Sequence, residues 1–177
     1  VADPTGEMGE LGAELTDAYA KLESASPEDY PALCEKTIDM LLALAAKNPA
    51  EEANFATQAA DLAFQGAQAG LYPKGAEKLA SIADAYKDSG NEEVKARIRY
   101  RQIAADFYAV ANAPRPKPAD LTKAQEKYAE DRASFAEEYA ATEAGAEAMM
   151  SLALDQEYML DNEAAAGYYS QISQNFG

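Results

Sequence analysis

Paired carboxylates are the residues of this sequence best suited to hold a metal ion. Adjacent acids occur at Glu51-Glu52, Glu92-Glu93 and Glu137-Glu138, and carboxylate oxygens are the ligands that Ca²⁺ and Mg²⁺ prefer. Neighbouring side chains on a helix diverge by about 100°, so the two members of a pair cannot close on one cation. The spacing therefore favours a solvated helix face over a metal site.

The single cysteine, Cys34, is the other residue with reactive chemistry. One thiol cannot close an internal disulfide or form a Cys-x-x-Cys redox pair, and the chain contains no histidine to activate it. Its place beside Leu33 is typical of a buried thiol that packs as a small hydrophobe. The sequence also lacks phosphate-loop, nucleophile-elbow, dinucleotide-glycine and calcium-loop motifs. We therefore expect this chain to be no enzyme and to hold no cofactor or metal.

A cluster of cations is the strongest candidate for a binding site. Its members are Lys95, Arg97, Arg99, Arg101, Arg115 and Lys117. Asp106 is the only acid between them in an otherwise acidic chain. Two interpretations remain open: the cations pair with acids on neighbouring helices, or they form a docking strip for an acidic peptide or for another domain of the same protein.

The overall charge restricts the partners. The chain carries 31 acidic and 15 basic residues, a net charge of −16, and such a surface repels nucleic acid and anionic lipid. No apolar run approaches the roughly 20 residues that span a bilayer, so no membrane insertion is expected. Val1 follows no initiator Met, which indicates a processed or trimmed start. A removed export signal would place the protein outside the cytoplasm, with a cytoplasmic location as the alternative.

The elements that must position these residues are predicted to be helices. Ala-, Leu-, Glu- and Lys-rich runs are separated by Gly, Asn and Pro, which divides the chain into about eight helices with no strand. Asn48-Pro49 is expected to open the third helix and Asn91 to cap the fifth. Three prolines between residues 113 and 119 predict an irregular connection there.

The fifth helix, about residues 92–112, has apolar residues on two opposite faces. Ala96, Tyr100, Ile103 and Phe107 lie on one face, and Val94, Ile98 and Ala105 lie nearly opposite. Two polar stripes run between them, one with Lys95 and Arg99 and the other with Arg97 and Arg101. We therefore expect this helix to be buried on two sides.

One sequence pattern occurs twice, as YRQIAADF at 100–107 and YSQISQNF at 169–176. The pattern predicts three equivalent pairs, which are Tyr100 with Tyr169, Ile103 with Ile172 and Phe107 with Phe176. Phe107, Tyr139 and Phe176 end successive helices at spacings near those of stacked helical repeats, where each aromatic would pack between hairpins. Most tyrosines fall on apolar stripes and are expected in the core, but Tyr168 cannot face the same groove as Tyr169 and is a candidate binding residue.

Two stretches, LASIADAYKDSGNEEVKARIRYRQIAADF at 79–107 and AMMSLALDQEYMLDNEAAAGYYSQISQNF at 148–176, resemble tetratricopeptide units. Matching positions are Ala83, Tyr86, Gly90, Ala96, Tyr100 and Ala104 in the first, and Leu154, Tyr158, Ala166 and Tyr169 in the second. The resemblance implies an all-α, right-handed array of about four antiparallel helical hairpins, an α-solenoid. The array is expected to form a single domain over residues 1–177, which is either complete or a fragment of a longer chain.

The function implied by this resemblance is protein binding. A non-catalytic interaction scaffold would receive a protein or peptide segment on its concave face or on the basic cluster. Phrases such as FAEEYAATEAGAEAMMSLA are similar to repeats of exported bacterial proteins, including helical extensions ahead of thioredoxin-like domains. The alternative is therefore a helical N-terminal domain of an exported thiol-disulfide oxidoreductase whose catalytic domain lies outside this chain.

Overall fold

The computed structural model describes residues 4–177 and contains eight α-helices and no strand within that range. The helices are α1 (Pro4–Glu23), α2 (Tyr30–Lys47), α3 (Glu52–Gln68), α4 (Gly75–Tyr86), α5 (Glu92–Ala111), α6 (Pro118–Glu138), α7 (Glu143–Tyr158) and α8 (Asn162–Phe176). The predicted all-α class is therefore confirmed. No helix in the described part of the chain is both long and apolar enough to cross a bilayer.

Side-chain capping explains the starts of α5, α7 and α8. The Asn91 side chain accepts a hydrogen bond from the Val94 amide, as predicted for the fifth helix. Thr142 caps α7 through the Gly145 amide in the same way. The expectation for the third helix was wrong, because Asn48 ends α2, its amide bonding the Leu44 carbonyl, and α3 starts only at Glu52. A turn over residues 48–51 separates the two helices, since the Glu51 amide bonds back to the Asn48 carbonyl.

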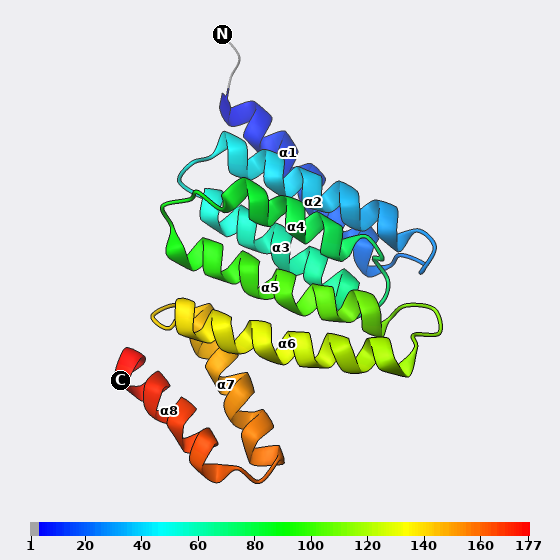
Figure 1. Ribbon diagram of the computed structural model, residues 1–177. Coiled ribbons are helices and arrows are strands. Elements are labelled where there is room, and N and C mark those ends of the chain that lie inside the picture. The colour runs from blue at the N-terminus through cyan, green and yellow to red at the C-terminus, as the bar shows by residue number, and fades with distance from the viewer. Residues whose placement is uncertain (1–3) are drawn as a thin grey trace.

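The helices are arranged so that alternate members touch. Each helix contacts the next one along the chain, and α5 also contacts α3 and α7. Within residues 4–177, the backbones of α4, α6 and α8 do not lie close to one another. Figure 1 shows α1 to α5 packed side by side, α6 lying below α5 and running back alongside it, and α7 and α8 folded as a pair at the far end from the N-terminus. We refer to α3, α5 and α7 as the inner row.

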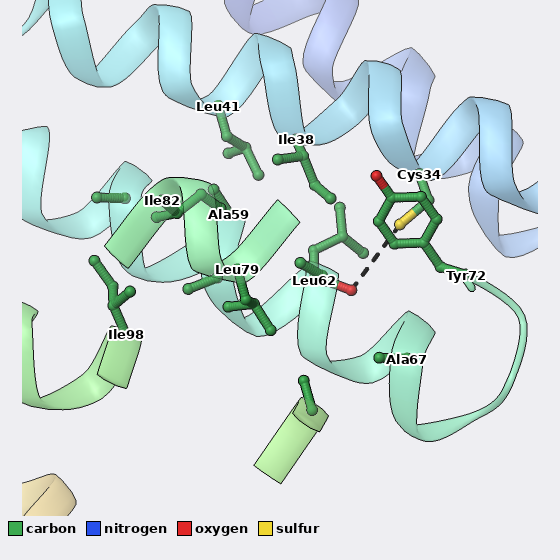
Figure 2. Close-up of a cluster of buried hydrophobic side chains, with 14 of the residues drawn as sticks. Cys34, Ile38, Leu41, Ala59, Leu62, Ala67, Tyr72, Leu79, Ile82 and Ile98 are labelled. Carbon is green, nitrogen blue, oxygen red and sulfur yellow. Dashed lines mark hydrogen bonds between the residues drawn. The ribbon is translucent and has the colours of Figure 1, made fainter. Parts of the chain in front are cut away.

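Helix α5 joins two hydrophobic cores, as its two apolar faces predict. Val94, Ile98 and Ala105 belong to a core built with α2, α3 and α4, and Figure 2 shows Ile98 pointing toward Leu79 and Ile82 in this core. On its other face, Ala96, Tyr100 and Ile103 belong to a second core with α6 and α7. Both faces are therefore buried, and α5 connects the two halves of the molecule.

Cys34 lies inside the first core and is fully buried. Its Sγ is 4.0 Å from the carbonyl oxygen of Leu62, the contact drawn in Figure 2. Burial raises the pKa of the Cys34 thiol to about 12, against a smaller lowering effect of a hydrogen bond with Tyr30. The thiol is therefore protonated near neutral pH and behaves as the packing residue expected from the sequence.

The repeated sequence pattern occupies two different environments. Tyr100 is buried in the second core and stacks on Phe135, whereas the residues of α8 that pack on this core are Tyr168 and Ile172. Tyr169 instead lies beside Glu157. Desolvation is the larger cause of the raised pKa of Tyr169, and the Glu157 carboxylate raises it further. The expected equivalence of Tyr100 and Tyr169 is therefore wrong, because α5 is enclosed by four helices while the backbone of α8 lies close only to α7 among the described helices.

The helix-ending aromatics differ in the same way. Phe107 is half-buried and stacks on Tyr128 of α6 with ring centroids 5.1 Å apart, so the predicted contact with the sixth helix is present. Tyr139 packs on the second core and stacks on Phe135 at 4.8 Å. Phe176 is exposed. The Phe107 stack therefore joins α5 to α6, whereas the Tyr139 stack lies within the C-terminal end of α6.

Truncating these two phenylalanines should separate their roles. If Phe107 were fully buried, Phe107→Ala would lower the free energy of unfolding by about 3–5 kcal/mol. Because the ring is only half-buried, we expect a decrease of about 2 kcal/mol. Phe176→Ala should cost less than about 1 kcal/mol because its ring is exposed. Urea unfolding followed by far-UV circular dichroism measures both. Equal losses in the two variants would show that the Phe107 stack contributes nothing particular.

Two glycines form a matched pair for testing the α6–α7 connection. A Cβ at Gly145 would lie 2.0 Å from the Tyr139 carbonyl oxygen, whereas a Cβ at Gly167 of α8 would meet no atom within 4 Å. Gly145→Ala should therefore destabilise the protein by about 1–3 kcal/mol. Gly167→Ala should stabilise it by about 1 kcal/mol, since alanine favours an exposed helix interior. A thermal melt of both variants checks this, and a stable Gly145→Ala would contradict the close approach.

Candidate functional site

The basic cluster does not form one continuous surface. Lys95 and Arg99 lie on one side of α5, where they line a hollow with Tyr86 of α4 and Tyr139. Arg97 and Arg101 lie on the other side, toward α3 and α7. The two polar stripes expected from the helical spacing are thus present, and they point to different neighbours.

Arg97 and Arg101 are held in a network of ion pairs across the inner row. Arg101 donates from Nε to Asp61 Oδ1 at 2.7 Å and from Nη1 to Glu147 Oε1 at 3.0 Å. Arg97 donates to both Asp61 oxygens at 3.2 and 3.4 Å. The Arg101 side chain is only 14% exposed, and its guanidinium lies 5.0 Å from the Phe64 ring centre. These two arginines therefore connect α3, α5 and α7.

The remaining cations of the cluster have local partners or lie apart. Lys95 pairs with Glu92 at 2.5 Å, and this contact raises the pKa of Lys95. Arg99 donates to Gln102 at 2.9 Å. Arg115 and Lys117 are exposed on the connection between α5 and α6. The structure therefore agrees with pairing to acids on neighbouring helices for Arg97 and Arg101 only, because Lys95 pairs within α5.

A hollow of about 310 Å³ lies at the N-terminal ends of the inner row. It is lined by Ala53, Asn54, Thr57 and Asp61 of α3, by Asn91, Glu93, Val94 and Arg97 at the start of α5, and by Glu143 and Ala144 of α7. We call it the inner-row hollow. Because the first turns of all three helices line it, the three helices run in the same direction.

Glu93 fixes one side of the inner-row hollow. Both of its carboxylate oxygens accept from the Glu143 amide, at 3.1 and 3.3 Å. A carboxylate at a helix N-terminus is favourable because it satisfies a free amide and faces the positive end of the helix dipole. The start of α7 is therefore attached to α5 at the edge of the hollow.

A second hollow, between α5 and α6, is mainly apolar. Ile103, Phe107 and Tyr128 line it, with charged side chains at its rim. One of these, Asp106, has a pKa raised by burial, an effect that the charges of Lys127 and Arg99 oppose. Lys127 itself pairs with Asp131 one turn further along α6. The charged side chains of α6 at this hollow are therefore partly paired with one another.

Arg132 is a structural residue that sequence reasoning missed. It is buried, donates to Asp155 Oδ2 at 2.5 Å and Ser151 Oγ at 2.6 Å, and lies 4.4 Å from the Tyr128 ring centre. Its position four residues after Tyr128 and three before Phe135 places it on the apolar face of α6. A single cation on an apolar helix face was the signal for a partner on another helix, here α7.

Tyr168, the candidate binding residue on α8, is half-buried. It packs on the second core and also lines a groove between α6 and α8, opposite Ala133 and Ala136. Its ring is therefore shared between packing and an open surface. Tyr169, expected in the packing role, lies beside Glu157 instead.

Metal chemistry has no ligand set in the described part of the chain. No group of three or more Asp, Glu and Cys side chains there is placed to hold an ion. Comparison with protein-family models, with curated proteins and with solved structures gave no match to this chain. The function is therefore inferred from the geometry of the inner row and of the exposed surfaces.

Removing the shared carboxylate tests the inner-row network. Asp61→Asn leaves Arg97 and Arg101 without their common partner, so unfolding free energy should fall by about 1–3 kcal/mol. The matched control is Asp84→Asn, which breaks the exposed pair with Lys87 and should cost less than about 0.5 kcal/mol. Chemical denaturation of both variants measures the difference.

A double-mutant cycle refines this test. Adding Arg101→Met to Asp61→Asn should cost less than the sum of the two single changes, because the arginine has already lost one of its two carboxylate partners and keeps only Glu147. Additive losses, or equal losses in Asp61→Asn and Asp84→Asn, would show that the network does not hold the inner row.

Proposed function

We propose that this chain is a non-catalytic protein-interaction scaffold built of tetratricopeptide-like helical repeats, and that it binds an extended peptide segment in the inner-row hollow. The observation that carries the proposal is the convergence of three parallel helices on one hollow lined by amide, hydroxyl and charged side chains. Such a surface can recognise a peptide backbone through side-chain hydrogen bonds.

The contacts between helices support the repeat architecture. Every second helix from α3 to α7 touches the next member of the inner row, whereas α4 and α6 touch only their chain neighbours within residues 4–177. A right-handed array of about four helical hairpins, an α-solenoid, produces this alternation because one helix of each pair lies on the inner side. The inner-row hollow then lies on the concave side of the array.

The chemistry of the hollow favours an uncharged or basic peptide. Asp61, Glu93 and Glu143 line it against a single cation, Arg97, which is already paired with Asp61. An acidic peptide would therefore meet excess negative charge. Asn54 is exposed and hydrogen-bonds only to the nearby side chains Glu51 and Gln58, so its amide can exchange these bonds for a peptide backbone.

The same residues support a binding role in place of catalysis. The Thr57 hydroxyl donates to carbonyls of its own helix at 2.9 Å, and no base contacts it. Cys34, the only thiol, is fully buried and has a raised pKa. It therefore stays protonated, and the thiol is not the nucleophilic form of cysteine. The hollow therefore contains acceptors and donors, and no activated nucleophile.

A peptide selection tests the proposal. Random peptides of about 12 residues, enough to cross three helices in extended form, are displayed on phage and selected on the immobilised chain. A selected peptide is synthesised and titrated against the wild type and Thr57→Arg. Because arginine would fill the hollow, binding should weaken at least about tenfold, equal to about 1.4 kcal/mol.

Thr122→Arg is the matched control, because Thr122 is exposed on α6, away from the hollow. It should bind the peptide as the wild type does. Equal affinity of the wild type and Thr57→Arg would contradict the hollow as the binding site, as would a selection that yields no binder.

A further inference from the structure

Five large apolar side chains are exposed together at the end of α7 and in the turn that follows. They are Met150, Leu154, Tyr158, Met159 and Leu160, with exposed fractions from 43% to 91%. We call them the tip patch. Phe176 is the only other exposed large hydrophobic residue in the described part of the chain, so this concentration is specific to one end of the molecule.

Helix α7 leaves this stripe free after burying its other face. Met149, Leu152 and Ala153 are buried against α5, α6 and α8. Met150, Leu154 and Tyr158 follow at four-residue spacing and therefore lie one above the other on the opposite, exposed side. An apolar row that the described part of the chain leaves largely exposed marks an interaction surface.

Leu160 provides an independent observation at the tip of this patch. Its φ is +64°, in the left-handed region that β-carbons disfavour. The chain makes the same turn after α3, where Gly70 takes the left-handed position at φ +70°. The hydrogen bonds of the two turns match. The Gly70 and Leu160 amides each donate to the carbonyl three residues before, and the amides of the following residues donate to the carbonyls of Gly66 and Gln156.

The leucine therefore costs stability that a glycine would not. The left-handed conformation is disfavoured for a residue with a side chain, and the strain is not offset by burial because Leu160 is 84% exposed. Strained backbone that holds an apolar side chain in solvent is typical of a binding position.

The surroundings of the tip patch define the charge of its partner. Asp155, Glu157, Asp161 and Glu163 flank it in sequence, and residues 133–177 contain eight acids and no lysine or arginine. A second copy of the chain would bring this acidic surface against itself, and like charges across an interface are unfavourable. Anionic membranes are disfavoured for the same reason.

We propose that the tip patch binds an amphipathic helix of another protein, with its apolar face on Met150, Leu154, Tyr158, Met159 and Leu160 and with lysines and arginines along both flanks. An apolar helix face seated on an apolar surface, with anchors at four-residue spacing, is a common recognition mode. Met150 and Met159 suit it because unbranched thioether side chains adapt to different partners. This surface is separate from the inner-row hollow and its ligand.

Methionine methyl resonances provide a direct test. The chain has five methionines, of which Met150 and Met159 are exposed while Met149 is fully buried. The probe is a designed peptide of about 18 residues, long enough to form a helix on a surface, with leucines on one face and lysines on both flanks. Its titration into methyl-labelled protein should shift the Met150 and Met159 signals saturably and leave Met149 unchanged.

Matched peptides and variants separate specific docking from simple charge attraction. A peptide with glutamates in place of the lysines, and one with the same composition but no apolar face, should each bind at least about tenfold more weakly. Leu154→Asp should weaken binding by a similar factor, whereas Thr122→Asp on α6 should not.

Leu160→Gly tests the strained turn. This variant should unfold at higher denaturant concentration, because glycine relieves the strain, and should bind the lysine peptide several-fold more weakly. Unchanged affinity in Leu154→Asp, or equal binding of the scrambled or glutamate peptide, would overturn the proposal. Concentration-dependent dimerisation that Leu154→Asp abolishes, or methyl shifts caused by neutral phosphatidylcholine vesicles and not by the peptide, would also overturn it.

Discussion

The burial of both faces of α5 is the constraint on which the rest of the structure depends. One face completes the core of α2, α3 and α4, and the other completes the core of α6 and α7. Small residues make this possible, since Ala96 on one face and Ala105 on the other are fully buried and allow neighbouring helices to approach closely. If α5 unfolded, apolar residues of both cores would be exposed to solvent.

Charge pairing then fixes how the inner row is aligned. Arg97 and Arg101 meet Asp61 of α3 and Glu147 of α7, so two cations of the central helix hold both of its inner neighbours. Such pairs contribute little net stability, because burying the charges offsets much of their attraction. Their effect is to penalise other alignments, in which a mostly buried arginine would face no carboxylate. Arg132 has the same effect between α6 and α7 through Asp155.

Using the cations internally leaves acidic surfaces for partners. The inner-row hollow has three carboxylates and one paired arginine along its lining, and the tip patch has acids around an apolar row. The two surfaces differ in kind: the hollow offers hydrogen-bonding groups to an extended segment, and the tip patch offers apolar area to a helix. The two proposed sites do not overlap, since α7 lines the hollow with Glu143 and Ala144 in its first turn and carries the tip patch from Met150 onward.

The sequence by itself determined the all-helical class, the cap at Asn91, the burial of Cys34 and the two-sided burial of α5. These features depend on local periodicity and capping, which act within a few residues. Whether the cations of the basic cluster are paired depends on contacts between residues 36 and 46 positions apart, from Arg97 to Asp61 and from Arg101 to Glu147. Only the tertiary structure could therefore decide it. The rotation of α8 was also decided there, because a helix turns by about 100° per residue and its neighbour determines which side is buried. That rotation brings Tyr168 rather than Tyr169 onto the core. For the same physical reason the sequence could show that α7 has an apolar row at Met150 and Leu154, but not that the described helices leave this row exposed.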